Sequence, residues 1–337
     1  MHPAQLRNYT IKSNFERIYI ERCINIYPIK FKNLYYEKIW GGRDFTAFRD
    51  NLPEGNIGES WDIACHKNGI SIVENGEFKG RRFDEIINEY GHAIIGSKIS
   101  EERFPLLVKL INSRENLSVQ VHPDDKYALE NENDYGKTEA WYVIDAKPGA
   151  KIVAGTKSCN KERFYKAVVE NKCEELLNYI EVKKGDVFLI KSGMIHAIGS
   201  GMIILEIQQN SDITYRVYDY GRPRKLHIAK AMDVINFSLK AENLSNTKIK
   251  ECNGYSISKL CKNKYFAIVK VKVKSEYKDI GEEERFHIIT CVEGKGIISG
   301  NGVASEIKCG DSFFIPANLE EYKIQGNMSV LKSYVVI

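Results

Sequence analysis

Apolar and polar side chains alternate strictly in the segment LSVQVH, residues 117–122. A period of two predicts a β-strand that presents Gln120 and His122 on one face. After Pro123 the chain is acidic and rich in Asn, which predicts a loop, and an extended pattern resumes at TEAWYVI. That second strand can return antiparallel and place Glu139 opposite the first one. A His, a Glu and an amide oxygen that converge inside a sheet indicate a candidate metal site.

Three segments have apolar side chains at helical spacing, residues 81–96, 160–180 and 225–237. Ser158 or Asn160 is the expected N-cap of the second segment. Most of the other segments are short, rich in β-branched and aromatic residues, and separated by Gly-containing turns. Many short strands with few helices are typical of jelly-roll barrels, so the sequence predicts a mainly β protein.

An internal repeat predicts two such barrels. KKGDVFLI at 183–190 matches KCGDSFFI at 308–315, and similar turns, VIDAKPG and CVEGKG, precede them. Aligning the turns puts His287 where Glu139 stands, and aligning the two blocks puts Glu321 where His196 stands. The second copy lacks a Gln-x-His pair, so we expect it to be a barrel without a metal.

These patterns predict the domain organisation. Residues 1–26 form an N-terminal extension of unknown role, and residues 27–240 form a catalytic domain with a small helical insert near 159–180. Residues 254–337 form the second, metal-free barrel. The weakly patterned segment 241–254 is the expected linker.

Composition and charge narrow the class of protein. The longest apolar runs of the 337 residues are strand-sized, which predicts that the chain does not cross a membrane. The net charge of +4 is small and its charges are interspersed, which argues against a nucleic-acid partner. The eight Cys include no CxxC pair, so we expect reduced thiols and a cytoplasmic protein.

Two blocks resemble the metal-binding motifs of the cupins. The segment from Gly185 to His196 is similar to the second cupin motif, with Lys191 in place of the usual Pro. The first motif is altered more, because Gln120-x-His122 replaces His-x-His and the acidic ligand is deferred to Glu139. Both departures are found together in one subgroup of the superfamily.

That subgroup is the type I mannose-6-phosphate isomerases, in their short bacterial form. From about Tyr27 onward, seven segments resemble family segments in family order: FKNLYYEKIWGGR, GESWDIA, PLLVKLI, LSVQVHPDD, GKTEAWYVIDAKPGA, SGMIHAIGSG and ITYRVYDYGR. One such motif would be weak, but seven in order are specific. The resemblance does not cover residues 1–26.

The resemblance implies one Zn²⁺ per chain and the interconversion of mannose 6-phosphate and fructose 6-phosphate. It also implies Gln120, His122, Glu139 and His196 as metal ligands and Arg216 as the catalytic Arg. Lys137, on the same strand face as Glu139, is the expected second catalytic cation. We expect Lys109, the one Lys of an otherwise apolar strand, to bind the substrate together with Glu206. The N/O donor set suits Zn²⁺, and Fe²⁺, Mn²⁺ or Co²⁺ can also bind it. The ligands alone do not choose the metal.

Two other functions fit parts of the pattern. Two His and one carboxylate are the ligand set of Fe²⁺ oxygenases, although the candidate cations suit a more anionic substrate. A non-catalytic sugar-binding double cupin is the second alternative. For individual residues, Lys137 can simply be solvated, and Glu206 can be a structural partner of Arg216. His66, His92, His227 and His287 are expected to be ordinary surface or core histidines.

Overall fold

The computed structural model describes residues 25–337 of the chain. The predicted N-terminal extension therefore lies outside the described residues except for Asn25 and Ile26. Ile26 is buried and packs among the apolar side chains of the C-terminal barrel. Within the described residues, no helix has both the length and the apolar character needed to cross a membrane.

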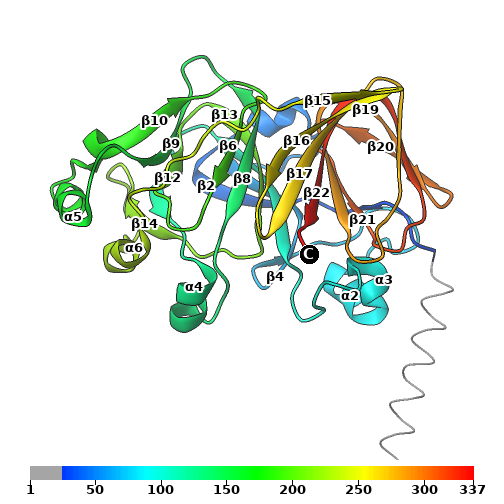
Figure 1. Ribbon diagram of the computed structural model, residues 1–337, viewed down its shortest axis with the longest axis horizontal. Helices are drawn as coiled ribbons and strands as arrows, with labels where there is room; N and C mark the ends of the chain where they lie inside the picture. The colour runs from blue at the N-terminus through cyan, green and yellow to red at the C-terminus, as the bar shows by residue number, and fades with distance from the viewer. Residues whose placement is uncertain (1–24) are drawn as a thin grey trace, which may run out of the picture.

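Two antiparallel sheets form the first barrel, on the left in Figure 1. The six-stranded sheet has the order β11 (Val187–Ile190), β8 (Glu139–Ala146), β13 (Met202–Gln209), β6 (Leu106–Ser113), β3 (Ile57–Ile63) and β2 (Leu34–Gly42). The five-stranded sheet has the order β10 (Leu177–Glu181), β9 (Lys151–Thr156), β12 (His196–Ile198), β7 (Val119–Val121) and β14 (Tyr215–Tyr218). Trp141 and Val143 of the first sheet pack against Ile152 and Ile198 of the second. The two sheets therefore face each other across one core.

The second barrel is built from the C-terminal strands, on the right in Figure 1. Its main path runs β1 (Ile29–Lys30), β21 (Ser312–Ile315), β19 (His287–Gly300), β22 (Tyr322–Val335), β17 (Phe266–Val273), β16 (Tyr255–Lys262) and β15 (Ile249–Cys252). Two further strands, β18 (Glu276–Asp279) and β20 (Val303–Lys308), pair with β22 and β19. The expected linker, residues 241–254, thus contains a strand. Because Ile29 pairs with Phe314, the start of the described chain belongs to this barrel.

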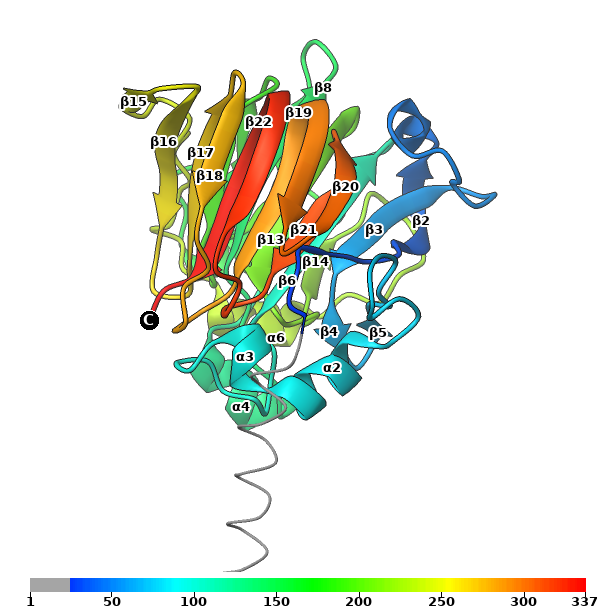
Figure 2. The same ribbon diagram turned by 90° about the vertical axis from the view of Figure 1, so that its right-hand side faces the viewer.

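One apolar core joins the two barrels. It contains Leu110 and Leu205 of the six-stranded sheet together with Phe266 and Ile288 of the C-terminal sheet. Figure 2 views the molecule from the side of the C-terminal sheet, with α2 (Phe83–Tyr90) and α3 (His92–Ile95) below it. Phe83 of α2 contacts Phe314 of β21, with ring centroids 5.0 Å apart. The mainly β fold of two barrels is therefore as predicted, and the barrels share a continuous interface.

The helical predictions are confirmed in part. Residues 81–96 form α2 and α3, and 225–237 contain α6 (Ile228–Val234). The insert holds α5 (Lys161–Val169) and the 3₁₀ helix η2 (Cys173–Leu176), but its last residues form β10 instead. Asn160 is the N-cap of α5, accepting a hydrogen bond from the Arg163 amide at 3.0 Å. The small helical insert therefore ends earlier than predicted.

The predicted loop after Pro123 contains a helix. Asp124 caps α4 (Asp125–Glu132) by accepting a hydrogen bond from the amide of Tyr127. Most side chains of α4 are exposed or half-buried, so the helix has little apolar periodicity for a sequence pattern to reveal. The N-cap Asp was the available signal.

The predicted pairing of the two metal-site strands is wrong. The strand with Gln120, β7, lies in the five-stranded sheet, whereas Glu139 begins β8 in the six-stranded sheet. The side chains still converge, because the two sheets face each other across the barrel. Pattern alone predicted the strands and their faces but not which strands are neighbours.

The internal repeat has a structural counterpart. Glu139 pairs with Ile190 in the first barrel, and His287 pairs with Ile315 in the second, as the alignment of the two blocks predicts. Asp186 accepts a hydrogen bond from the Lys183 amide at 2.9 Å. Asp311 accepts the equivalent bond from the Lys308 amide at the same distance. The two blocks thus form the same turn. The exact domain boundaries stay a prediction.

Candidate active site

Two rows of cross-strand neighbours carry the candidate site. On the five-stranded sheet, Gln120 of β7 lies opposite His196 of β12 and Arg216 of β14. On the six-stranded sheet, Glu206 of β13 lies opposite Lys109 of β6 and Trp141 of β8. Directly opposed residues share a face, so each row projects from one side of its sheet.

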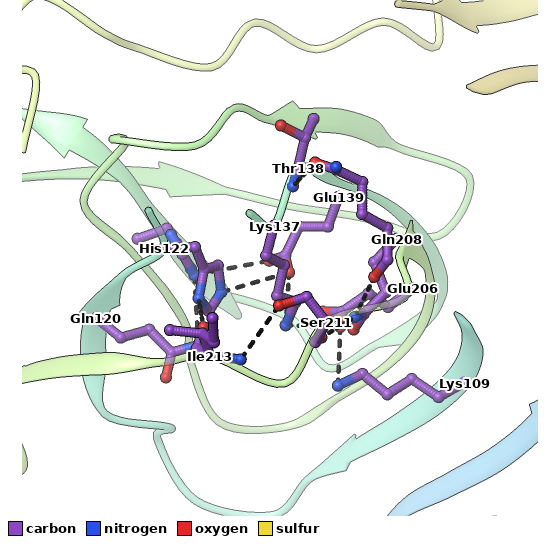
Figure 3. A network of polar contacts seen from close by, with 12 residues as sticks. Lys109, Gln120, His122, Lys137, Thr138, Glu139, Glu206, Gln208, Ser211 and Ile213 are labelled. Atoms are coloured by element: carbon purple, nitrogen blue, oxygen red, sulfur yellow. Dashed lines mark hydrogen bonds and ion pairs between the residues drawn. The ribbon is translucent and has the colours of Figure 1, made fainter. Parts of the chain in front are cut away.

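His122, Glu139 and His196 meet between the sheets. Figure 3 shows His122 beside Glu139. His122 Nε2 lies 3.5 Å from Glu139 Oε2, and His196 Nε2 lies 3.6 Å from Glu139 Oε1. All three side chains are almost fully buried. Their donor atoms lie within 4.8 Å of one another, which is close enough for one ion to contact all three.

The main chain orients both imidazole rings. His122 Nδ1 lies 2.7 Å from the Ile213 carbonyl oxygen, and His196 Nδ1 lies 2.9 Å from that of Met194. Each Nδ1–H therefore donates to a carbonyl, and each Nε2 is left as an acceptor that faces Glu139. Burial, and then the nearby Lys137, lower the pKa of His122, and burial lowers the pKa of His196 to about 4. Neutral rings with a free Nε2 are the form that binds a metal.

Gln120 lies beside this cluster. Its amide nitrogen is 3.3 Å from His196 Nε2, and its amide oxygen accepts a hydrogen bond from Ser118 Oγ. Rotation of the terminal amide by half a turn exchanges the two atoms without moving the rest of the side chain. That rotation would direct the oxygen toward the histidines, as a metal ligand requires.

A chain of alternating charges leads away from the cluster (Figure 3). Lys137 Nζ lies 2.9 Å from Glu139 Oε2 and 3.4 Å from Glu206 Oε1. Lys109 Nζ lies 3.0 Å from Glu206 Oε1, and all four side chains are buried. Although burial alone would raise the pKa of Glu139, Lys137 and His122 hold it well below its usual range. The Glu139 carboxylate is therefore available as an anionic ligand.

Glu206 does not pair with Arg216, contrary to the alternative raised by the sequence. Its carboxylate instead contacts Lys109 and Lys137 and accepts a hydrogen bond from Trp141 Nε1 at 2.9 Å. Burial would lower the pKa of Lys109, but Glu206 and Glu59 outweigh it, so the pKa is raised and the ammonium is retained. Lys137 is likewise buried in these contacts and is not a solvated surface lysine.

Arg216 projects into the same space from the opposite sheet. Its Nε donates to Ser118 Oγ at 3.1 Å, and one terminal nitrogen donates to the Lys225 carbonyl oxygen. Burial and then the neighbouring Arg224 lower its pKa. Arg224 is held by Asp219, which also binds Arg222. The segment DYGR, residues 219–222, is therefore a salt-bridged turn. Its Asp219 also holds Arg224 near Arg216.

A cavity of about 310 Å³ is lined by all the predicted cationic side chains. Lys109, Lys137, Glu206, Gln120 and Arg216 contribute to its wall. The three-residue cluster contacts this wall through Gln120 and Lys137. Six polar lining residues were not predicted as site residues: Lys38, Glu59, Ser118, Asp212, Thr214 and Arg224. Alternation could have found Ser118, which lies two residues before Gln120 on the same strand face.

The buried donors fit a metal ion. His122 Nε2 and Glu139 Oε1 have no hydrogen-bond partner within residues 25–337. Leaving buried polar atoms unpaired is costly, and a bound cation would satisfy both. Two imidazole nitrogens and a carboxylate, with the Gln120 amide oxygen as a fourth donor, form a mixed N/O set.

Comparison with known proteins agrees with this geometry. Residues 29–142 match "Phosphomannose isomerase type I, catalytic domain", and residues 256–335 match "Mannose-6-phosphate isomerase, cupin domain". Mannose-6-phosphate isomerase ManA of Bacillus subtilis is 35% identical over 325 residues, covering 91% of this chain and 99% of the relative. The chain belongs to the type I phosphomannose isomerase family.

Other family members support the same relationship. Mannose-6-phosphate isomerase of Streptococcus mutans is 35% identical over 314 residues, covering 91% of this chain and 98% of the relative. The crystal structure of mannose 6-phosphate isomerase from Bacillus subtilis superimposes with a TM-score of 0.84 at 35% identity, again over 91% of this chain and 99% of that one. The catalytic-domain match includes His122 and Glu139, and His196 and Arg216 follow it in the sequence.

Proposed function

We propose that this chain interconverts mannose 6-phosphate and fructose 6-phosphate, with one Zn²⁺ per chain held by Gln120, His122, Glu139 and His196. The observation that supports this most is that a three-donor cluster adjoins a cavity lined by buried cations. Relatives that carry the name mannose-6-phosphate isomerase, at 35% identity over almost their whole length, support it independently. A bound Zn²⁺ would supply Lewis acidity to sugar oxygens beside it.

The chain's own residues would handle the charge that this reaction develops. Aldose–ketose conversion moves a proton from C2 to C1, and negative charge builds up on the sugar oxygens as the proton leaves. Arg216 carries a fixed positive charge in the cavity, so it stabilises that charge or orients the phosphate. Lys137 adds a second cation next to Glu139. We therefore assign Arg216 and Lys137 catalytic roles.

Lys109 and Glu206 are proposed as substrate-binding residues. Both line the cavity, and their 3.0 Å ion pair fixes an ammonium donor beside a carboxylate acceptor. Hydroxyl groups of a sugar can use both kinds of partner. The substrate partner is thus a small sugar phosphate, and we propose a cytoplasmic location because the seven described cysteines are free thiols.

The site also disfavours the two alternative functions. Five cationic side chains line the cavity, Lys38, Lys109, Lys137, Arg216 and Arg224. Such a wall suits a phosphorylated substrate better than the less anionic substrates of most oxygenases. The relatives are named as isomerases, which also disfavours a purely sugar-binding role.

One experiment tests the assignment. Metal-analysed protein is incubated with mannose 6-phosphate, and the formation of fructose 6-phosphate is followed. We expect His122→Ala to lose bound metal and activity together. His287→Ala is the matched control, since it removes an equally buried histidine from the second barrel. It should keep both.

A second variant separates the metal from the cation. Arg216→Ala should retain stoichiometric metal and lose kcat by about 100-fold or more, the usual effect of removing a group that stabilises an oxyanion. Normal turnover by this variant would refute the role of Arg216. Oxygen consumption that requires Fe²⁺, without sugar isomerisation, would instead support the oxygenase alternative.

A further inference from the structure

The segment that carries Lys137 into the site lies outside both sheets. Residues 135–138 come between α4 and β8 and form no strand, yet Gly136, Lys137 and Thr138 are buried. Buried backbone amides outside secondary structure need other partners. The position of Lys137, and of Glu139 directly after the segment, therefore depends on the groups that those amides bind.

Three consecutive amides of this segment are held by groups outside it. The Gly136 amide donates to Asp125 Oδ1 at 3.0 Å, and the Lys137 amide donates to the Pro123 carbonyl oxygen at 3.1 Å. The Thr138 amide donates to Gln209 Oε1 at 2.9 Å. Gln209 Nε2 in turn donates to Asp125 Oδ1 at 3.0 Å. One carboxylate, that of Asp125, thus organises the segment directly and through Gln209.

Close packing makes this segment move with Asp125. A Cβ on Gly136 would lie 2.4 Å from the carbonyl carbon of Asp124 and 2.5 Å from the Asp125 amide nitrogen. Since real atoms do not approach so closely, the backbone at 136 lies directly against the start of α4. A displacement of Asp125 would therefore be transmitted to Lys137 through this backbone contact and through the hydrogen bond from the Gly136 amide to Asp125 Oδ1.

The other oxygen of Asp125 is bound from the second barrel. Tyr265, in the turn between β16 and β17, donates its phenol hydrogen to Asp125 Oδ2 at 2.6 Å. The turn is itself fixed, because Asn263 Oδ1 accepts hydrogen bonds from the amides of Tyr265 and Phe266. Burial and the Asp125 carboxylate raise the pKa of Tyr265, so the phenol stays protonated and remains a donor.

We propose that Tyr265 is a positioning residue that the C-terminal barrel contributes to the active site. Acting through Asp125 and Gln209, it fixes the segment 136–138 and so aligns Lys137 and Glu139. This inference rests on the proposed isomerase function. The C-terminal barrel lacks a Gln-x-His pair and is expected to hold no metal. Through Tyr265 it would nevertheless contribute to turnover.

The test is Tyr265→Phe, which removes one hydroxyl and keeps the ring. We expect kcat to fall about tenfold with KM changed less than about twofold, because a small displacement of Lys137 impairs the reaction more than binding. Metal content should stay stoichiometric. Hydrogen exchange, measured by mass spectrometry on peptides spanning residues 133–140, should become faster because the amides of 136–138 are less firmly held.

Tyr277→Phe is the matched control. It removes the same kind of phenol–carboxylate bond, between Tyr277 and Asp279, entirely within the C-terminal barrel. Its kcat and its exchange at 133–140 should equal those of the wild type, whatever it does to stability. A wild-type kcat in Tyr265→Phe, or an equal loss in Tyr277→Phe, would overturn the proposal.

A second variant tests whether the two residues act together. Asp125→Asn keeps the size and an amide oxygen but removes the charge that attracts the phenol hydrogen. The loss in the double variant with Tyr265→Phe should be smaller than the product of the two single losses, and independent losses would contradict the proposal. If the wild type fails to isomerise sugar phosphates, the proposed function fails, while the exchange experiment still reports on the Tyr265–Asp125 contact.

Discussion

At the scale of single residues, the site depends on buried charges that compensate one another. Glu59, Lys109, Glu206, Lys137 and Glu139 alternate in sign from the outer wall of the cavity to the histidine cluster. Burial alone would raise the pKa of Glu59, but Lys109 and Lys38 outweigh it and hold the pKa at about 2. An isolated buried charge is strongly unfavourable, so each of these side chains makes its neighbour tolerable. The arrangement holds these charged side chains at fixed positions beside a small cavity.

A second compensated group, in the C-terminal barrel, allows a prediction about pH. Glu282 accepts a hydrogen bond from His287 Nε2 at 3.0 Å and pairs with Arg285. The His287 bond and the Arg285 charge lower the pKa of Glu282 from 4.5 to about 2. Because the folded-state pKa is the lower one, the stabilisation is complete above about pH 4.5 and disappears as the pH falls toward 2.

We therefore expect Glu282→Gln to reduce the free energy of unfolding by about 1 kcal/mol at about pH 7, a value that allows for solvent screening of a partly exposed carboxylate. The difference between the two proteins should shrink between about pH 4.5 and pH 2. Urea denaturation of both proteins at several pH values measures it. A difference that does not change with pH would show that Glu282 contributes no charge-dependent stability.

At the scale of elements, the same turn precedes β11 and β21, but its surroundings differ between the two barrels. Gly185 and Gly310 both have left-handed φ angles, 91° and 90°. A Cβ at 185 would come no closer than 4.0 Å to the Tyr142 hydroxyl, whereas a Cβ at 310 would lie 2.6 Å from the Phe48 ring. The backbone requirement for glycine is the same, but only the second turn packs against another part of the chain.

This difference predicts unequal effects of the same substitution. Gly185→Ala should cost roughly 1–2 kcal/mol of unfolding free energy, the penalty for an L-residue in the left-handed region. Gly310→Ala should cost at least about 1 kcal/mol more, because the new methyl group also displaces Phe48. Chemical denaturation of the two variants measures both values. Equal losses would mean that the Phe48 contact relaxes at no cost.

Periodicity predicted those features that depend on neighbouring residues in the sequence. The alternation around Gln120 and the Gly-Asp turns was sufficient to predict strands, a barrel fold and the faces of the candidate ligands. Pairing between strands depends on residues distant in the sequence, so the separation of β7 and β8 into different sheets could not be read from the pattern. The polar helix α4 was missed for a related reason, since it lacks an apolar period and is stabilised by a cap and by contacts with distant parts of the chain.

Contacts of the candidate site show the same limit. Lys137 and Glu139 could be placed together because they are two residues apart. The partners of Glu206 could not, because Lys109 and Lys137 reach it from β6 and from the segment before β8. The carbonyl groups of Ile213 and Met194, which orient the two imidazole rings, have no sequence signature at all. The residue types predicted a metal site with nearby cations. The tertiary structure determines which of these side chains contact one another.

At the scale of the whole molecule, a buried ion cluster and a shared core bind the two barrels together. Arg49 donates to Asp62 at 2.8 Å and to the Gly310 carbonyl oxygen, and it lies 3.5 Å from Asp311. The Phe104 and Phe286 rings stack across the same interface, with centroids 4.9 Å apart. Separating the barrels would expose this apolar surface and break the contacts of Arg49 with Gly310 and Asp311.

We therefore expect both barrels to unfold in one cooperative transition. The three tryptophans, at positions 40, 61 and 141, all lie on strands of the first barrel, so their fluorescence reports on that barrel. Cys291 is fully buried in the second barrel, so its modification by a thiol reagent, located by mass spectrometry, reports on that barrel. The two signals should change at the same denaturant concentration, since breaking the interface destabilises both partners at once. Labelling of Cys291 at a concentration where the fluorescence is still native would mean that the barrels unfold independently, and that the Arg49 cluster is too weak to couple them.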